Sequence, residues 1–476
     1  MTAHMTAFII ALYPPNRQKF MDGATRDLET MLGDPRAAIK SMLLPLLVSY
    51  LVVQINLFAD TSWCSGLGEE ASSAVSTISP IYWIVSGFGT GLGVGAATAI
   101  ARHLGRGERT DADRLASQTI VLSLIMGIVC TPILFLVVDP AVHMMGADSI
   151  IQNCRDYIYP QVIAATVVIL DGTVSGIIRS EGAAKRSMVV LLVSSAVNMV
   201  LDPVMIYGLD MGLAGAGWAT AVASAASAAL GLWWYARGRL FLRIRIRDMK
   251  PIWSDVRDIL FVGIPRGTES MLISLMSMVQ RIFVIACGGT SAAMFYNIPW
   301  RFVSICEVVS QAVGAALIPV CSAALGRKDA DKAMAGYRYS FRITMVTMVI
   351  MAAVLFVFAD LVIIPFTYSP TMEPFRDEFA HVLRIYALLI PFMGMVDIGS
   401  SVLQSLRMAQ MSMISSFARN ILIVVMLFFA STVSMDAIYW SLLVAEIFGG
   451  ILMLWLARDG FRKYRKRLDP APQARA

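Results

Sequence analysis

Two pairs of an amide and a carboxyl stand out among the side chains of this sequence. Asn56 precedes Asp60 by four residues, and Asn198 precedes Asp202 by the same spacing. Residues four apart share one face of a helix, so each pair places an amide beside an acid. Both pairs lie in long apolar stretches, where an ionisable side chain costs roughly 2.5–3.5 kcal/mol and is therefore a functional candidate. The pattern predicts a site that takes up a proton or binds Na⁺.

A proline strengthens the second pair. Pro203 has no N–H, so the carbonyl of Met199 loses its helical donor, and Asp202 is biased away from helical angles. An acid, an amide and a free carbonyl together offer the ligands of a proton or sodium site. The alternative is an acid wetted at the membrane interface. It applies more to Asp60, which lies near the end of its apolar stretch, than to Asp202.

The elements that position these residues are helices that cross a membrane. Hydrophobic residues make up 57% of the chain and charged residues only 15%, compared with about 25% in soluble domains. Apolar runs of about 20 residues, long enough to span hydrocarbon, recur throughout. They predict an all-α polytopic membrane protein with twelve transmembrane helices near 41–62, 75–103, 113–138, 151–179, 184–207, 213–236, 257–282, 291–325, 333–358, 376–406, 410–431 and 437–457.

Lysine and arginine gather in alternate connections. The basic groups within 102–114, 237–250 and 462–467 all fall on one side of the predicted membrane, whereas the connections on the other side contain few basic residues. By the positive-inside rule the basic side is cytoplasmic. We therefore predict a multi-pass protein of the plasma membrane with cytoplasmic N- and C-termini. The net charge of +6 belongs to these loops and indicates no nucleic-acid partner.

The chain also repeats itself. Three markers recur after 220 or 221 positions: Leu104 and Leu325, Pro45 and Pro265, and Trp234 and Trp455. This offset predicts two repeat lobes of six helices each. The predicted organisation is a cytoplasmic extension at 1–36, an N-lobe at 37–236, a basic linker at 237–256, a C-lobe at 257–457 and a basic cytoplasmic tail at 458–476.

The repeat tests the interpretation of the acids. Asp60 aligns with Gln280, and Asp202 aligns with Val424, so the second half keeps the scaffold without either acid. This asymmetry favours a coupling site in the N-lobe. Asp171 is a third acid of that lobe, without an amide four residues away, and is a secondary candidate.

Other charges lie at depth in the C-lobe: Arg301, Glu307, Asp397, Arg419 and Glu446. Two interpretations stay open, namely mutual neutralisation in ion pairs and contact with a cationic substrate.

Several other classes of site have no support in the sequence. The six cysteines form no CxxC pair and the four histidines share no ligand spacing, so we predict no disulfide framework and no metal site. No Ser/His/Asp set or pair of catalytic carboxylates occurs at a common depth, so the chain is not predicted to be an enzyme. The glycine-rich stretch 87–95 lacks the GK[ST] of a phosphate loop, and Gly91 and Gly95 predict close helix packing instead.

With these motifs in place, the chain resembles the multidrug and toxic compound extrusion (MATE) family over about residues 33–457. The motifs that carry the resemblance are "LPLLVSYLVVQINLFAD", "AIARHLGRGE", "IIRSEGAAKRSM", "NMVLDPVMIYGLDMGLAGAGWAT" and "SAALGRKDADKA". Within the family it looks more like the DinF or archaeal-type branch, whose cation site uses acids of helices 1 and 5.

The resemblance also implies roles for individual residues. It places Asp60, Asn198 and Asp202 at the cation site, with Tyr157 and Thr220 at polar positions nearby and Glu181 as the acid of the loop between helices 4 and 5. The NorM branch relies on acids of the C-lobe instead. Asp397 matches its helix 10 acid, but Glu269 lies only four residues after Pro265, too early for its glutamate.

The function implied by the resemblance is secondary active export. H⁺ or Na⁺ would be exchanged for amphiphilic, mostly cationic small molecules by a monomer in the lipid bilayer, with no cofactor besides the coupling ion. Protonation from the outside is expected to shift the first helix and expel the substrate. The alternative is a flippase for a lipid-linked precursor or an exporter of a metabolite. The flippase would need a cationic central cavity that includes Arg301 and Arg419.

Overall fold

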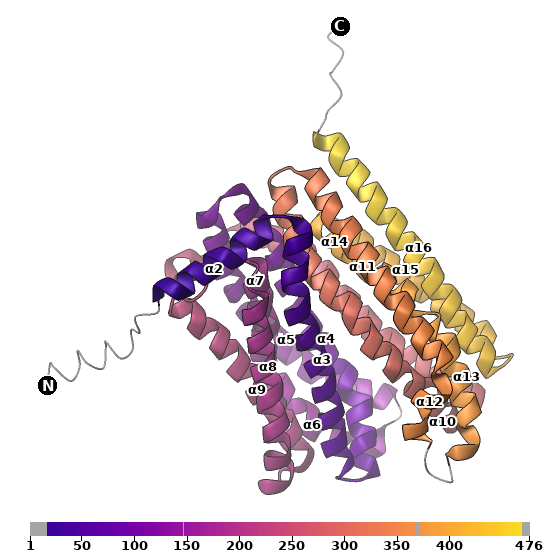
Figure 1. Ribbon diagram of the computed structural model, residues 1–476. Helices are drawn as coiled ribbons and strands as arrows, with labels where there is room; N and C mark the ends of the chain where they lie inside the picture. Colours follow the sequence, from indigo (N-terminus) through magenta and orange to yellow (C-terminus); the bar gives the residue numbers. More distant parts are fainter. Residues whose placement is uncertain (1–16, 146, 368–371, 469–476) are drawn as a thin grey trace.

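The computed structural model describes residues 17–145, 147–367 and 372–468, and these residues are helical apart from short connections (Figure 1). Eleven of the described helices are long and apolar enough to cross a membrane, and a bent pair brings the number to as many as twelve. No strand occurs among the described residues. The predicted all-α membrane fold is therefore confirmed.

The two lobes stand side by side in Figure 1, with the N-lobe from indigo to magenta and the C-lobe from orange to yellow. The first lobe contains α2 (Arg17–Leu32), α3 (Pro35–Ser65), α4 (Glu69–Arg106), α5 (Arg109–Met144), α6 (Ile151–Ile163), α7 (Ala165–Ser180), α8 (Ala184–Pro203) and α9 (Gly212–Ala236). The second contains α10 (Trp253–Gly326), α11 (Ala330–Val357), α12 (Ala359–Ile363), α13 (Arg376–Ala387), α14 (Ile390–Ser405), α15 (Ala409–Ala430) and α16 (Met435–Leu468). Short turns at η1 (Asp148–Ile150), η2 (Val204–Gly208), η3 (Ile246–Met249), η4 (Ile364–Phe366) and η5 (Glu373–Phe375) complete the chain.

Two of the expected spans are not straight. The span expected at 151–179 is the pair α6 and α7, which bends by 56°. Pro160 lies one turn before the bend and cannot donate a helical hydrogen bond, which accounts for the kink. Conversely, α10 joins two spans across Gly289, whose φ of 74° is open mainly to glycine.

The structure also adds helix at both ends of the chain. Part of the expected N-terminal extension forms α2, and Asp34 then caps α3 by accepting a hydrogen bond from the N–H of Ala37 at 3.0 Å. The earlier part, residues 1–16, lies outside the described residues. At the other end, α16 continues to Leu468, so that all of the described part of the expected tail is helical.

The connection between the lobes is bound to the N-lobe along its length. Four N-lobe side chains accept hydrogen bonds from backbone N–H groups of this segment: Glu181 from Leu242 (2.9 Å), Asp113 from Arg243 (2.8 Å), Ser117 from Arg245 (3.1 Å) and Gln118 from Ile252 (3.3 Å). The segment expected as a linker is thus held in place by side chains of α5 and of the α7–α8 connection.

Glycine brings the lobes together. Gly91 and Gly95 of α4 face α10, and a Cβ on Gly95 would lie 2.3 Å from the carbonyl oxygen of Ile259. On Gly91 it would lie 2.6 Å from the carbonyl oxygen of Gly263. The predicted close packing of this GxxxG pair is confirmed, and it joins the two lobes rather than helices of one lobe.

Polar contacts between the lobes gather at one end of the molecule, where α4 and α16 both end in basic residues; we call it the basic end. Here Arg102 donates to the carbonyl of Ser405 (3.1 Å), and Arg327 donates to the carbonyl of Gly105 (2.8 Å). Towards the opposite end, a cavity of about 150 Å³ separates α3 from α10. The lobes therefore contact each other directly through polar groups at the basic end.

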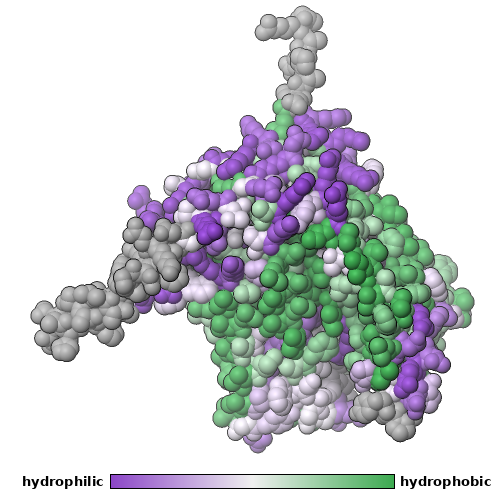
Figure 2. Space-filling view, viewed as in Figure 1, coloured by the Kyte–Doolittle hydropathy of each residue, from purple (hydrophilic) through white to green (hydrophobic). Residues whose placement is uncertain are grey.

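The outer surface has the character expected of a membrane protein. Figure 2 shows a green apolar band across the middle of the visible face and purple hydrophilic side chains at the basic end. Large apolar side chains are highly exposed in this fold, among them Leu136 (76%), Ile128 (65%) and Phe429 (65%). Exposed apolar surface of this extent fits contact with lipid.

The orientation in the membrane is a prediction that cysteine labelling can test. We expect Asp210→Cys, between η2 and α9, to react with a membrane-impermeant maleimide added to intact cells, because the positive-inside rule places it outside. Arg247→Cys, in the basic connection between the lobes, should react only after the cells are opened. The wild-type chain, with its six cysteines, supplies the background. External labelling of position 247 would overturn the topology.

Candidate functional site

The two amide–carboxyl pairs meet in the structure. Asn56 of α3 donates to the side-chain oxygen of Asn198 of α8 at 2.8 Å. Asn198 in turn donates to Asp202 at 3.1 Å, and its amide nitrogen lies 3.4 Å from the Thr220 hydroxyl of α9. Three helices of the N-lobe are thus linked through one asparagine.

The second acid lies beside this chain. Asp60 accepts a hydrogen bond from the Tyr157 hydroxyl of α6 at 3.3 Å and is near enough to Asp202 for the two carboxylates to repel each other. Asp60 is 9% exposed and Asp202 is fully buried. All six residues predicted for the cation site therefore lie in one cluster, which we call the N-lobe cluster: Asn56, Asp60, Tyr157, Asn198, Asp202 and Thr220.

The N-lobe cluster has spare acceptor capacity. Asp202 Oδ2 and Asn56 Oδ1 are buried and have no hydrogen-bond partner among the described residues. Buried acceptors without a donor are costly, and a proton or a small cation at this point would satisfy them. Because two adjacent buried carboxylates repel each other, binding of one positive charge would relieve both penalties.

The backbone conformation next to Pro203 differs from the expected one. Asp202 stays within α8, and the irregularity follows it as the π turn η2, in which the N–H of Leu209 donates to the carbonyl of Val204 at 2.8 Å. Proline is accommodated here by widening of the next turn rather than by a break before it. Such π turns are frequent at functional sites.

Helix α3 joins the N-lobe cluster to the space between the lobes. Asn56 and Asp60 face α8 and α6, whereas Phe58 and Thr61 line the cavity of about 150 Å³ between α3 and α10. Across this cavity the Arg301 guanidinium lies 5.1 Å from the centre of the Phe58 ring. A shift of α3 would therefore change the N-lobe cluster and the cavity between α3 and α10 at the same time.

The two remaining N-lobe candidates lie elsewhere. Asp171 of α7 accepts a hydrogen bond from Ser227 of α9 at 2.5 Å. Glu181 is 1% exposed and binds the connection between the lobes through Leu242. Burial raises the pKa of Glu181 to about 8, although the hydrogen bond from Leu242 opposes this shift. Among the described contacts, no hydrogen bond connects either acid with the N-lobe cluster.

The sequence reasoning missed Glu269 of α10. This side chain is 3% exposed, pairs with Arg266 at 3.0 Å and accepts a hydrogen bond from Ser416 at 2.6 Å. Ser412 and Ser400 add contacts of 3.3 and 3.5 Å. Two of these serines are spaced four apart on α15, and this polar face within an apolar helix was the available signal.

The other C-lobe charges lie close to this group, because Arg266 and Arg419 are near enough to Asp397 to attract its carboxylate. Asp397 accepts a hydrogen bond from Ser310 at 2.5 Å and is close enough to Glu307 to repel it. Arg419 forms an ion pair with Glu446 at 3.1 Å, which supports the neutralising interpretation for these two residues. Gln280, which replaces the acid of the first repeat, accepts a hydrogen bond from Tyr296 at 2.5 Å.

One group of potential metal ligands occurs among the described residues. His103, Glu108 and Asp111 come within 4.8 Å of one another at the basic end of α4. Glu108 contacts His103 at 2.7 Å, and Asp111 pairs with Arg114 at 2.8 Å. These contacts describe a surface ion-pair network.

Comparison with known proteins decides the family. The MatE family model matches residues 45–204 and 265–429, one segment in each lobe. The chain belongs to the MATE family. Membership makes it a membrane transporter rather than an enzyme, and the two matched segments correspond to the two repeats.

Individual MATE relatives agree with this assignment. The multidrug export protein MepA of Staphylococcus aureus is 26% identical over 397 residues, which cover 81% of this chain and 86% of MepA. MepA of Staphylococcus haemolyticus is 24% identical over 391 residues, with 81% and 84% covered. A MOP superfamily transporter from Pyrococcus furiosus has a TM-score of 0.87 at 25% identity, covering 92% of this chain and 98% of that structure. A MATE family transporter in an outward-facing conformation gives the same values.

Proposed function

We propose that this protein is a secondary active multidrug exporter of the plasma membrane that exchanges H⁺ or Na⁺ for amphiphilic, mostly cationic small molecules. The names of the relatives support the export of several drugs. The observation that carries the proposal is the double role of α3, which presents Asp60 to the N-lobe cluster and Phe58 to the cavity between the lobes.

Cation binding would act through the shape of α3. An unpaired carboxylate in the N-lobe cluster attracts water, amide donors and cations, and its neutral form no longer does. Pro45 lies within α3 and cannot donate a helical hydrogen bond, so this helix can bend there. Uptake of a proton from the outside would let α3 and α8 repack, contract the N-lobe side of the cavity and release the substrate.

An ion gradient is sufficient as the source of energy. The sequence contains no phosphate-binding loop. One charge that crosses a potential of 100 mV supplies about 2.3 kcal/mol, which exceeds the roughly 1.4 kcal/mol of a tenfold concentration gradient. Because the N-lobe cluster contains two neighbouring acids that repel each other, competition between H⁺ and Na⁺ for the same carboxylates is expected. We propose that the transporter acts as a monomer. We also propose that it lies near the DinF or archaeal-type branch, because both of its Asn–Asp pairs lie in the N-lobe.

The arrangement of the arginines favours export over a flippase. A flippase for a lipid-linked pyrophosphate needs several cations in one central cavity. Arg301 lines the cavity between the lobes, but Arg419 is paired with Glu446. The two arginines therefore do not form a joint cationic surface.

Transport in inside-out vesicles tests the proposal. Ethidium should accumulate in the vesicles when an imposed pH gradient makes their interior acidic, when an imposed Na⁺ gradient is directed outward, or under both conditions. The comparison of the two gradients identifies the coupling ion. Vesicles without the protein give the leak. Accumulation that is independent of both gradients would contradict secondary active export.

A further inference from the structure

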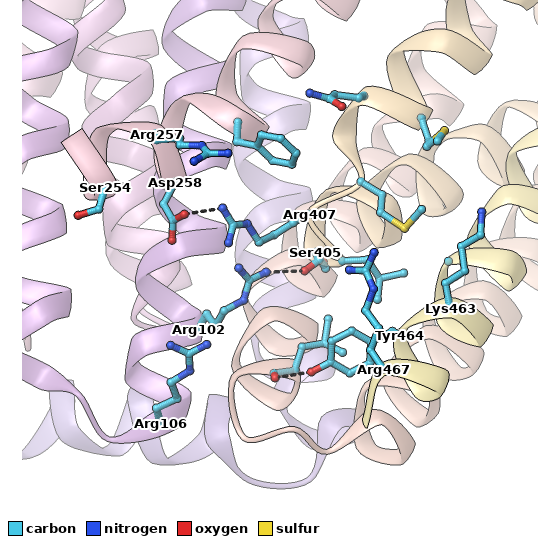
Figure 3. A pocket seen from close by; sticks show the side chains of 17 residues that line it. Arg102, Arg106, Ser254, Arg257, Asp258, Ser405, Arg407, Lys463, Tyr464 and Arg467 are labelled. Carbon is cyan, nitrogen blue, oxygen red and sulfur yellow. Dashed lines mark hydrogen bonds and ion pairs between the residues drawn. The ribbon is translucent and has the colours of Figure 1, made fainter. Parts of the chain in front are cut away.

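A second and larger cavity lies at the basic end, away from the N-lobe cluster. It has a volume of about 700 Å³ and is lined by residues of α4, the two ends of α10, the α14–α15 region and α16 (Figure 3). The walls come from both lobes, because α4 belongs to the first and the other three elements belong to the second. Nothing in the proposed transport cycle uses this cavity.

The lining of this cavity is strongly cationic. Six of its residues carry a positive charge: Arg102, Arg106, Arg257, Arg407, Lys463 and Arg467. Asp258 is the only acid among the described residues that line the cavity, and it is paired with Arg407. Outside the lining, Asp459 pairs with Lys463 at 2.6 Å and Glu108 lies 3.6 Å from Arg106. Arg407 and Arg106 are also near enough to Arg102 to repel it. Figure 3 shows the labelled cationic side chains arranged around one space.

Two of the cations have no partner in the described part of the chain. Arg257 and Arg467 are exposed and form neither a hydrogen bond nor an ion pair there. Arg102 donates to a backbone carbonyl and forms no ion pair within the described part of the chain, although Asp258 is near enough to attract it. Like charges gathered in this way repel one another, so that an anion in the cavity would be stabilised by several of them.

Arg407 adopts an unfavourable backbone conformation that places its side chain at the cavity wall. Arg407 has a φ of 61°, whereas the equivalent connection of the N-lobe, between α7 and α8, has Gly182 with a φ of 80°. A non-glycine residue in this region is uncommon and costs about 1–3 kcal/mol. The conformation places a guanidinium at the cavity wall where the first repeat has no side chain.

We propose that this cavity binds a phosphate-bearing anion. Guanidinium groups form paired hydrogen bonds with phosphate oxygens, and basic pockets between helices at the cytoplasmic membrane surface suit phospholipid headgroups. An anionic phospholipid of the inner leaflet and a soluble pyrophosphate present the same chemistry. The occupant would touch Arg102 of the first lobe and Arg407 and Arg467 of the second. It would therefore stabilise the conformation in which the two lobes contact each other at the basic end.

Thermal unfolding of the purified protein in dodecyl maltoside tests the proposal without any transport step. Dioleoylphosphatidylglycerol and inorganic pyrophosphate are titrated separately, and dioleoylphosphatidylcholine serves as the lipid without net charge. We expect the anionic lipid to raise the unfolding midpoint more than phosphatidylcholine does. The double variant Arg257→Gln/Arg467→Gln removes two charges that have no structural contact, so it should fold normally and bind the anion about thirtyfold more weakly.

The matched control is Arg247→Gln/Arg462→Gln. Both arginines are exposed at the basic end but lie outside the cavity lining, so the control removes the same charge and should leave the titration unchanged. Stabilisation by phosphatidylglycerol alone identifies a lipid, and stabilisation by pyrophosphate alone identifies a soluble ligand. Stabilisation by neither, or an equal loss in both double variants, would overturn the proposal.

Discussion

Replacement of Asp202 by asparagine is expected to abolish gradient-driven efflux while expression and membrane insertion stay near wild type. The variant keeps the size of the side chain and an oxygen that Asn198 can donate to, but it removes the carboxylate that exchanges the cation. Asp202 is fully buried, and its Oδ2 atom has no hydrogen-bond donor among the described residues. Loss of its charge also removes the repulsion between this carboxylate and that of Asp60. The measurement is ethidium uptake into inside-out vesicles under the coupling gradient.

The control is the same change at an exposed acid. Asp210 has a φ of 54°, a conformation that asparagine also tolerates, so Asp210→Asn should transport normally. Asp60→Asn should reduce efflux less severely if water reaches that carboxyl. Retained gradient-driven efflux in Asp202→Asn would remove this residue from the coupling site, and Glu307 and Asp397 would be tested next.

The largest loss of stability is expected from Glu269→Ala in the C-lobe. The change leaves Arg266 without its ion-pair partner and deprives Ser416 of its acceptor at 2.6 Å. Breaking a buried ion pair by removal of one partner costs about 3–5 kcal/mol. The lower part of this range applies because the Arg266 side chain is 33% exposed and water can replace part of the contact. The free energy of unfolding is measured by titration with dodecyl sulfate.

Two variants separate the structural role of Glu269 from a role in transport. Glu269→Gln keeps an acceptor for the serines and should lose less stability than the alanine variant. Glu378→Ala removes an exposed acid of the same lobe and should change stability by less than about 1 kcal/mol. If Glu269→Ala is as stable as Glu378→Ala but no longer exports ethidium, then Glu269 takes part in transport instead.

The sequence was sufficient for features that depend on local pattern. Apolar runs and turn residues predicted the spans closely, since a helix in hydrocarbon needs about 20 apolar residues whatever its neighbours are. Spacing also placed Asn56 and Asp60 on one face of α3. Spacing within one helix does not reveal which helices touch, so the bridge from Asn56 to Asn198 needed the structure.

The misjudged features depend on contacts between distant segments. Glu269 was set aside because its distance from Pro265 differs from another branch of the family, yet its serine partners come from α14 and α15. The cavity at the basic end is lined by arginines as distant in the sequence as Arg102 and Arg467. In the sequence alone, each of them resembles an ordinary charged residue of a loop. Asp202 was expected to be biased away from helical angles by Pro203, but it stays within α8 and the irregularity follows as a π turn.

The segments that follow Trp234 and Trp455 are copies of each other, but they differ in conformation and in role. In the first copy the helix ends at Ala236, Gly238 adopts a φ of 62°, and the chain continues as the bound connection between the lobes. In the second copy the helix runs on past Gly460 to Leu468 and forms a wall of the basic cavity. The repeated segment therefore has two different roles. One copy connects the lobes and is bound to the N-lobe, and the other forms part of the cavity that we propose binds an anion.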